Sequence, residues 1–497
     1  MSNFVIDTLV NKNKQILVFV STKRSAEAVA DKILSESKNF LKEEYEDLEK
    51  SILSALSSPT KQCRRLARLV KRGVSFHHSG LNSKQRSLVE REFKKGRIKV
   101  ICATPTLAAG VDIPAYRVLI RDTKRFTDRG MVSIPVLEYE QMSGRAGRPS
   151  YDKIGESLIL AKSIEERENL WHKYVMGEPE DIISKLAVEP VLRIYTLSLI
   201  ATKYVSNFSE LKKFMSRTFY ASQYGDYKSL EHNLGGILRS LEKWNFVVTE
   251  NKKSDFVSAN KLDDDYSLKP TSLGVRVSQL YLDPLTANDL IRGLESGDKG
   301  YFALLNLICY TIEMKPYFRL RKKDYELVQE KLIKEEFMFE EPDEFSIEYD
   351  DFLDSLKTSI VLESWIEEAS EEKIYEDYGV SPGELQMKLE RGDWLLYACS
   401  EFCRMKGLKD VFNRVNKLRS RFKNGVKEEL LVLLKLKNIG RVRARKLFNK
   451  GFTDLKSLKK TKPSELKSLL GEKTGLNVMK QLGISNEEDT KLFFSNQ

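Results

Sequence analysis

The sequence predicts a multidomain protein in which an α/β domain built on a parallel sheet precedes several mainly helical domains. Three observations lead to this prediction. The chain has 497 residues, a length that corresponds to about three to five domains. Short apolar runs alternate with helical patterns over the first 160 residues, which is typical of a parallel sheet covered on both faces. After Lys162 the pattern is mostly helical.

The expected strands of the α/β domain are short runs rich in Val, Ile and Leu. They are Ile16–Val20, Lys99–Ala103, Arg117–Ile120 and Ser157–Leu160. An Ala-rich helical pattern follows the first run and continues to Leu34, as period-3.6 spacing predicts. Functional groups of such a sheet collect in the loops beyond the carboxyl ends of its strands, so we expect a site there.

The remaining chain divides by pattern into three further regions. Helical segments from Ser184 lead to two short runs, Trp244–Thr249 and Ser267–Gly274, which flank a polar turn. Helices followed by such a hairpin predict a winged-helix domain. The next region is mostly helical, and the last ninety residues form short helices with Gly turns. The expected domains are residues 1–177, 178–278, 279–405 and 406–497.

The formal net charge of +11 is unevenly distributed along the chain. Residues Arg404–Lys450 hold 16 Lys and Arg against 3 Asp and Glu, a net charge of +13 in 47 positions. Residues Glu336–Tyr378 hold 16 acidic side chains against 2 basic ones, a net charge of −14. The basic block fits either a solvated helical surface or a face that binds phosphate groups.

The composition excludes several classes of protein. With 41% hydrophobic and 31% charged residues, the chain is globular rather than disordered. The longest nearly uncharged apolar stretch, Tyr301–Ile312, is shorter than the roughly 18 residues that span a membrane, so no membrane partner is expected. Met1–Gln15 lack a signal-peptide pattern, and we expect a cytoplasmic protein. Five scattered cysteines and four histidines predict no metal site.

The most specific segment is Gln141-Met-Ser-Gly-Arg-Ala-Gly-Arg-Pro149. Arg145 and Arg148 are three residues apart, so they share one face at a helix start, and the glycines permit close backbone approach. Arginine suits phosphoryl groups because its planar guanidinium is always charged and binds oxygen atoms in pairs. Gln141 can position a water molecule or a phosphate oxygen. The segment therefore indicates phosphate chemistry.

Two other segments precede it, Phe76-His-His-Ser-Gly-Leu81 and Ala103-Thr-Pro-Thr-Leu-Ala-Ala-Gly-Val-Asp-Ile-Pro114. In this order and spacing, the three segments resemble motifs from the second RecA-like lobe of superfamily-2 helicases. The branch they resemble most is the Ski-type helicases, especially the archaeal 3′–5′ DNA repair helicases related to the helicase domain of polymerase theta. The resemblance implies an ATP-dependent DNA helicase that acts in repair or restart of replication forks.

The resemblance also implies roles for individual residues. Arg145 and Arg148 would be arginine fingers that reach the γ-phosphate of ATP, with Gln141 beside them. Gly110 and Asp112 would face the ribose and phosphates, although family members commonly carry Asn where this chain has Asp112. The residues implied to contact the DNA strand are Ser21, Thr22, His78 and Thr104.

Further likeness covers nearly the whole chain. The stretch Asp122–Pro135 occupies the position of a strand-separating β-hairpin, with Phe126 and Met131 at its tip; ordinary core contacts are the alternative role of this hairpin. Trp394 lies on the helix that resembles the family's ratchet helix, where it would stack on a base or, alternatively, fill the core. The family's Arg two turns earlier is replaced by Met387, and Lys388 next to it is the expected DNA contact.

The basic tail contains Asn438-Ile-Gly-Arg-Val-Arg-Ala-Arg-Lys446, which resembles a helix-hairpin-helix. Such a Gly turn presents backbone N–H groups at a helix N-terminus to a phosphate. Arg441, Arg443 and Arg445 would add side-chain contacts to DNA, which makes binding strongly dependent on salt.

The phosphate-cradling part of an ATP site has no counterpart in this sequence. None of the 26 glycines is followed by Lys, so there is no Walker A motif, and Asp343–Glu344 follows no apolar strand. We therefore expect ATP and Mg²⁺ to be shared with a separate chain that carries the first RecA-like lobe, with this chain a split-gene subunit or a fragment that is inactive alone. The alternatives are a non-catalytic nucleic-acid-binding protein and a subunit of a Ski-type RNA helicase.

Overall fold

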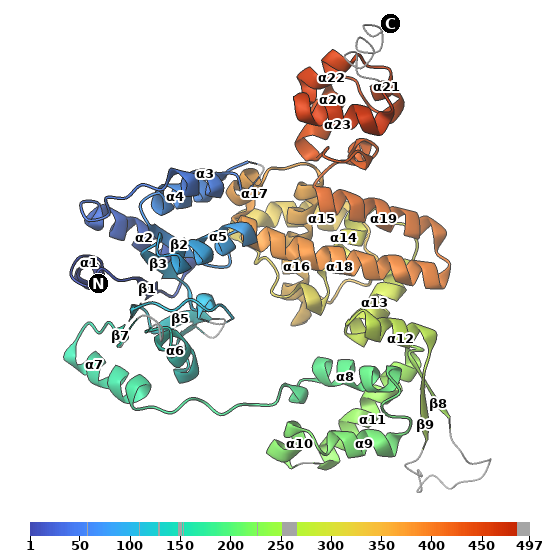
Figure 1. The fold of residues 1–497 in the computed structure, drawn as a ribbon. Helices are drawn as coiled ribbons and strands as arrows, with labels where there is room; N and C mark the ends of the chain where they lie inside the picture. Colours follow the sequence, from blue (N-terminus) through green and yellow to red (C-terminus); the bar gives the residue numbers. More distant parts are fainter. Residues whose placement is uncertain are drawn as a thin grey trace, which may run out of the picture. The chain divides into compact units, whose positions relative to one another are not determined.

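The computed structural model describes residues 1–484 except 57, 109, 128–129, 148–151, 153, 226 and 251–265. The chain divides into two compact units (Figure 1). Unit 1 consists of Met1–Ile182 together with Ser370–Met387, and unit 2 consists of Ile183–Ala369 together with Lys388–Gln497. Unit 1 is therefore built from two segments that are far apart in the sequence.

Unit 1 is an α/β domain around a five-stranded parallel sheet in the order β2-β3-β1-β4-β7. Its strands are β1 (Ile16–Phe19), β2 (Val74–His77), β3 (Val100–Ala103), β4 (Arg117–Ile120) and β7 (Glu156–Ile159). The first four are fully buried, as expected for a sheet covered on both faces. The parallel sheet predicted from the apolar runs is confirmed, and β2 is an additional strand that the pattern did not reveal.

Helices cover this sheet. They are α1 (Ser2–Val10), α2 (Lys23–Ser37), α3 (Glu46–Leu53), α4 (Lys61–Val70), α5 (Ser83–Lys94), α6 (Val136–Ser143) and α7 (Ile164–Leu170). The apolar face of α2 packs on β2 and β3, and that of α4 packs on β2. Arg117 at the start of β4 ties α1 to the sheet, because its Nη1 donates to the Phe4 carbonyl at 2.9 Å and to Thr8 Oγ1 at 2.7 Å.

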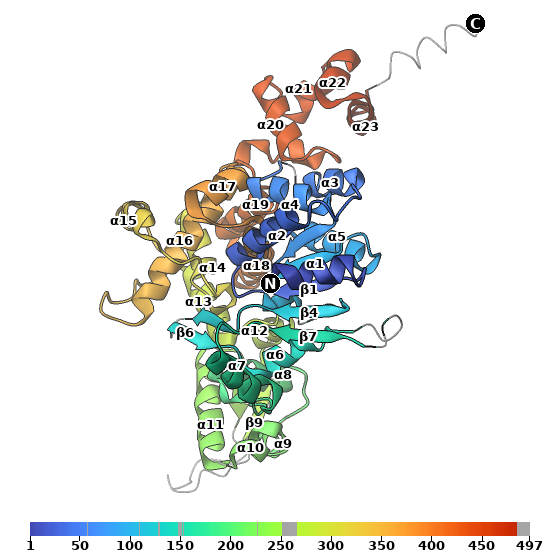
Figure 2. The same ribbon diagram turned by 90° about the vertical axis from the view of Figure 1, so that its left-hand side faces the viewer.

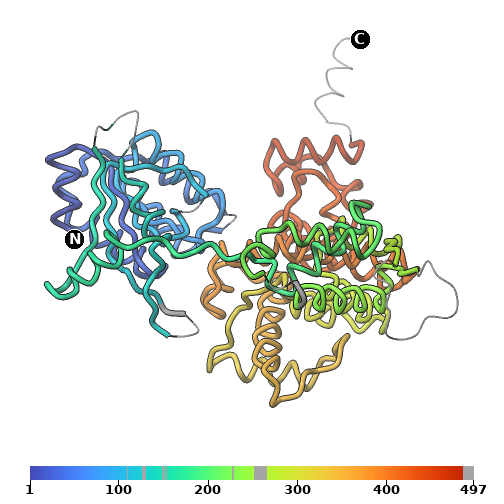
Figure 3. The backbone as a smooth tube through the Cα atoms, turned by 90° about the horizontal axis from the view of Figure 1, so that it is seen from below, coloured from blue at the N-terminus to red at the C-terminus, as the bar shows by residue number. Residues whose placement is uncertain are grey.

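A β-hairpin and a second chain segment complete unit 1. The strands β5 (Lys124–Thr127) and β6 (Gly130–Ser133) pair antiparallel, as the sequence predicted (Figure 2). The chain leaves the sheet through α7, the π-helical turn Trp171–Val175 and the irregular residues 177–184, which can be followed in Figure 3. Later in the sequence, α17 (Glu371–Tyr378) and the first residues of α18 (Pro382–Lys406) pack with unit 1.

The first part of unit 2 consists of helices and a two-stranded hairpin. The helices are α8 (Glu189–Ala201), α9 (Phe208–Met215), α10 (Phe219–Tyr224), α11 (Tyr227–Lys243) and α12 (Ser272–Gln279). The strands β8 (Val247–Glu250) and β9 (Ser267–Pro270) pair antiparallel, so the predicted hairpin is confirmed. Gly274 lies against the Phe246 carbonyl so closely that a Cβ atom would come within 2.0 Å of it.

The rest of unit 2 is helical. Its longer helices are α13 (Pro284–Glu295), α14 (Tyr301–Cys309), α15 (Tyr325–Lys334), α16 (Glu348–Ile366), the remainder of α18 and α19 (Lys409–Asn424). The apolar α14 packs against α16 and α19, and its residues from Phe302 to Cys309 are buried.

The C-terminal helices are α20 (Arg441–Asn449), α21 (Leu455–Lys459), α22 (Pro463–Leu470) and α23 (Glu472–Leu482). They form a separate hydrophobic cluster with Val426–Ile439 (Figure 1). The basic block belongs to unit 2, whereas the acidic block lies in unit 2 as far as Ala369 and in unit 1 from Ser370 onward.

Candidate nucleotide and nucleic-acid site

Four polar residues lie at the carboxyl edge of the unit 1 sheet. β1, β2, β3 and β4 are parallel and paired in register, so the residues that follow them lie along one edge. Ser21 follows β1, His78 follows β2, Thr104 follows β3 and Asp122 follows β4. The sheet therefore brings together residues that are up to about a hundred positions apart, at the edge where sheets of this type bind ligands.

Ser21 and Thr22 form the turn from β1 into α2. The Ser21 amide donates to Asp122 Oδ2 at 2.9 Å, and its hydroxyl group lies 3.2 Å from the same oxygen. Thr22 caps α2 by accepting a hydrogen bond from the Ser25 amide at 3.1 Å. Burial would raise the pKa of Asp122, but Arg121 and the Ser21 groups outweigh it and lower the pKa. The charged carboxylate therefore fixes the turn.

Thr104 begins the loop that contains Gly110 and Asp112. Its side chain is nearly buried, and its hydroxyl group lies 2.9 Å from that of Thr106. Gly110 has φ +81°, and no atom of the described residues lies within 4 Å of a potential Cβ, so on this side its backbone is open to a ligand. The Asp112 side chain is 86% exposed, and its carboxylate lies 3.9 Å from Lys94 Nζ.

The loop with Gly110 is joined directly to the arginine motif. The Ala115 amide donates to the Arg145 carbonyl at 2.9 Å, and the Gly147 amide donates to the Ala115 carbonyl at 2.7 Å. The Arg145 guanidinium also donates to the Ala108 carbonyl. Gly147 has φ +91°, a conformation that favours glycine. Two motifs more than 30 residues apart thus form one surface.

Gln141 lies on helix α6, which precedes Arg145 in the sequence. The Gln141 side chain is exposed near the C-terminal end of the helix. Glu180 satisfies the N-terminus of α6, because its carboxylate accepts from the Val136 amide at 2.7 Å and the Leu137 amide at 3.1 Å. Arg148, the second predicted arginine finger, lies outside the described residues.

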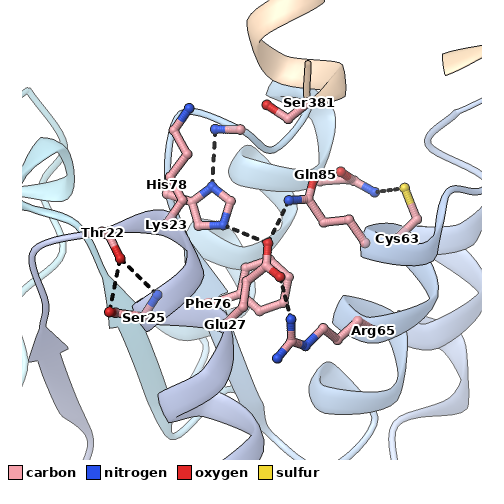
Figure 4. Close-up of polar contacts among 12 residues, drawn as sticks. Thr22, Lys23, Ser25, Glu27, Cys63, Arg65, Phe76, His78, Gln85 and Ser381 are labelled. Atoms are coloured by element: carbon pink, nitrogen blue, oxygen red, sulfur yellow. Dashed lines mark hydrogen bonds and ion pairs between the residues drawn. The ribbon is translucent and has the colours of Figure 1, made fainter. Parts of the chain in front are cut away.

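His78 does not occupy the DNA-facing position that the resemblance implied. Its side chain is fully buried and stacks on Phe76 with ring centroids 5.3 Å apart. Its Nδ1 accepts from the Gly80 amide at 3.1 Å and its Nε2 lies 3.3 Å from Glu27 Oε1 (Figure 4). Burial lowers the pKa of His78 more strongly than Glu27 raises it. We correct this assignment: a buried neutral ring holds the loop and cannot contact a phosphate.

The hairpin places Phe126 and Met131 opposite each other in register. The Met131 side chain is 66% exposed, so it is accessible to a partner. Only the backbone of Phe126 is described, and the turn residues between the strands lie outside the described part. The exposure of Met131 fits the predicted contact with a base pair.

Trp394 and Lys388 both lie on α18. Trp394 is partly buried, and its indole N–H donates to the Leu280 carbonyl at 3.0 Å. Lys388 is buried, and its ammonium group donates to the carbonyls of Met314 and Pro316. We correct the predicted DNA contact of Lys388, because its charge is already satisfied inside unit 2.

The three arginines of the basic tail differ in their surroundings. Arg445 forms a paired contact with Glu368 at 2.6 and 2.8 Å, and Arg441 lies over the Trp365 ring at 4.8 Å. Arg443 is exposed, and its guanidinium donates to the nearby Asn438 carbonyl at 3.0 Å. Of the three, Arg443 is therefore the most accessible to a phosphate.

Sequence reasoning missed the side chains that hold these loops, chiefly Glu27, Asp122 and Glu368. Each is one carboxylate among 72 acidic residues, and its partner lies far away in sequence. Of these three carboxylates, only Asp122 could have been found from the sequence. It comes just after a predicted strand, and the ends of strands in such sheets line the site.

Comparison with known proteins agrees with this geometry. A family model described as the helicase conserved C-terminal domain matches residues 51–150, and one described as domain 4 of archaeal helicases matches residues 302–425. The fold and the joined motifs therefore define a helicase region of the archaeal type.

Curated relatives match almost the whole chain. ATP-dependent DNA helicases Hel308 from Pyrococcus horikoshii and Methanocella arvoryzae are 38% and 39% identical over 95% and 97% of the chain. The one from Methanococcus vannielii is 36% identical over 97% of the chain. The chain belongs to the Hel308 family of archaeal helicases. It spans about two thirds of the length of these relatives, 65%, 64% and 67% respectively.

None of the helices in the described part of the chain is long and apolar enough to cross a membrane. In the same part of the chain, no three His, Cys, Asp or Glu side chains converge as metal ligands would.

Proposed function

We propose that this chain supplies the second motor lobe and the DNA-handling domains of an ATP-dependent 3′–5′ DNA helicase that acts on single-stranded or forked DNA. The observation that carries the proposal is the joining of the Gly110–Ala115 loop to the Arg145 segment at 2.7 and 2.9 Å. This surface offers a guanidinium, an open glycine backbone and an exposed Gln141 to one ligand. The Hel308 relatives, named as ATP-dependent DNA helicases, support it.

The surface fits one side of a nucleotide site. Arg145 and Arg148 would approach the γ-phosphate, and Gly110 and Asp112 would face the ribose and phosphates. Bound ATP supplies the free energy that drives the motor. The Arg145 guanidinium now donates to a carbonyl, and it can exchange this neutral acceptor for a phosphate, to which its hydrogen bonds are stronger.

The other side of the site must come from outside these 497 residues, because they contain no Gly-Lys dipeptide. We infer that a first RecA-like lobe outside these residues supplies the phosphate loop and the carboxylates that hold Mg²⁺.

The remaining regions take DNA-handling roles in this proposal. Residues 178–278 form a winged helix, 279–405 a ratchet domain and 406–497 a helix-hairpin-helix domain. Met131 and Phe126 press on the last base pair of the duplex, and Trp394 stacks on the translocating strand. Trp394 reaches a base only with its exposed part, because its indole N–H is bonded to Leu280. Ser21, Thr22, Thr104 and Arg443 contact the backbone of the strand.

The test is an ATPase assay of this chain alone and with a first-lobe chain that carries Gly-Lys-Thr and Asp-Glu motifs. We expect DNA-stimulated ATP hydrolysis only in the mixture. In Arg145→Ala the rate of ATP hydrolysis should fall about a thousandfold, which is the lower end of the effect of losing an arginine finger. Arg68→Ala, an exposed arginine on α4, is the matched control and should retain activity.

Other outcomes distinguish the alternatives. Strong DNA-stimulated hydrolysis by the chain alone would refute the separate first lobe. DNA binding without hydrolysis in any mixture would favour a non-catalytic binding protein. Preference for RNA over a matched DNA oligonucleotide would favour an RNA helicase, since the 2′-hydroxyl group distinguishes the two.

A further inference from the structure

The start of α18 is attached to the motor lobe by a set of close contacts. Although 300 residues separate them in the sequence, Ser370–Met387 belong to unit 1. The Gly383 amide donates to the Gly80 carbonyl at 3.0 Å. A Cβ on Gly383 would lie 2.3 Å from the carbonyl oxygens of Ser79 and Leu81, so only glycine permits this approach. The helix start therefore lies directly on the loop between β2 and α5.

Side chains fix the same junction from two further loops. Glu384 pairs with Lys23 at the first residue of α2, and it accepts a hydrogen bond from the Ser381 amide at 3.0 Å. The Gln386 amide group donates to Ser83 Oγ at 3.0 Å at the start of α5. The junction thus connects α18 to the turn of Ser21 and Thr22 and to the loop of His78.

His78 and Glu27 support the junction from inside the lobe. Figure 4 shows the Glu27 carboxylate beside the His78 ring, and the other ring nitrogen accepts a hydrogen bond from the Gly80 amide. Glu27 also accepts from Gln62 at 2.7 Å and from Arg65 at 2.5 Å. Both partners of Glu27 lie on α4, so the loop under Gly383 is connected to the helices of the lobe.

We propose that Gly383 and the Lys23–Glu384 pair are positioning residues that transmit movement of the motor lobe to α18. The helix continues without a break from Pro382 to Lys406, and Trp394 lies on it about two turns beyond Met387. Movement of the lobe is then delivered along α18 to the residue that holds the DNA strand. This inference rests on the proposed function.

The test uses charge reversal in the assembly of this chain with a first-lobe chain. The variants are Glu384→Lys, Lys23→Glu and the double swap, with Glu384→Gln as a milder change. The control is the same swap at Lys32 and Glu36, an exposed pair on α2 with its charges 3.9 Å apart. Base pairs opened per ATP hydrolysed, the ATPase rate and the Kd for single-stranded DNA are measured for each variant.

We expect each single reversal to lower the base pairs opened per ATP about fivefold or more, while the ATPase rate and Kd stay within about twofold. The double swap and the Lys32/Glu36 control should retain the ratio of the unmodified assembly. The inference is overturned if the single variants open as many base pairs per ATP as the unmodified assembly, or if the double swap fails to restore this ratio. In both cases the proposed helicase activity is unaffected. Absence of DNA-stimulated hydrolysis in the unmodified assembly would instead refute the proposed function and this inference with it.

Discussion

His78 illustrates how one buried titratable residue links stability to pH. Its ring is held neutral because burial lowers its pKa, whereas in the unfolded chain a histidine titrates near about 6.5. Between the two pKa values the unfolded state binds the extra proton, so the free energy of unfolding falls as pH decreases through this window. The contribution of the neutral His78 ring to the free energy of unfolding is complete above the pKa of histidine in the unfolded chain.

We therefore expect the unfolding midpoint to decrease less between about pH 7.5 and 5.5 in His78→Gln than in the unmodified chain. Glutamine can keep the hydrogen bond from the Gly80 amide but does not titrate. His172→Gln, which changes an exposed histidine, should follow the unmodified chain. Chemical unfolding at a series of pH values measures this, and equal slopes for all three proteins would contradict the assignment.

The residues of the site were predicted unevenly from the sequence. Arg145 and the Gly110 loop were recognised because their motif is local, and the structure joins the two segments. His78 and Lys388 were assigned to DNA because a motif reports the position of a residue but not its burial. Their partners, Glu27 and the carbonyls of Met314 and Pro316, come from other elements.

At the scale of elements, the arginines of α20 differ in their roles although they are close in sequence: Arg445 holds the helix in place, and Arg443 is accessible to DNA. Burial would raise the pKa of Glu368, but the paired contact with Arg445 and the Lys427 amide outweigh it and lower the pKa. Glu368 thus stays charged and fixes one face of α20. Arg443 lies on the exposed part of the same helix.

We expect Arg445→Ala to lower the free energy of unfolding by about 1–3 kcal/mol, because a partly buried carboxylate loses its charged partner. Arg443→Ala should leave stability unchanged and reduce the slope of log Kd against log salt concentration by about one. Lys473→Ala on α23 removes an exposed charge outside the motif and serves as the control. Denaturant unfolding and salt-dependent DNA titrations measure both effects.

The elements themselves were predicted where local patterns determine them. β1, β3, β4 and β7 were found because apolar residues form continuous runs, and both hairpins were found from their turn residues. β2 was missed because its sequence, Val-Ser-Phe-His, mixes polar and apolar side chains that are all buried. The attachment of α17 to unit 1 could not be predicted, since ion pairs such as Lys61–Glu376 at 2.5 Å join residues about 300 positions apart.

At the scale of the whole molecule, unit 1 is discontinuous in sequence. We expect that a protease site placed between Gly177 and Ile182 can be cut without releasing residues 1–177, because Ser370–Met387 remain packed in unit 1. The two fragments should elute together in native size-exclusion chromatography and separate on a denaturing gel. Glu384→Lys combined with Gly383→Ala should weaken the association, and release from the unmodified protein would contradict the prediction.

The same discontinuity has a consequence for synthesis on the ribosome. Domains usually fold from the N-terminus as they emerge, at about 5–20 residues per second. Unit 1 receives its last segment only when Met387 has been translated, after most of unit 2. For about ten seconds or more at that rate, the loop of Gly80 and the Lys23 side chain are exposed on the nascent chain without Gly383 and Glu384. Chaperones that bind nascent chains would meet this surface during that interval.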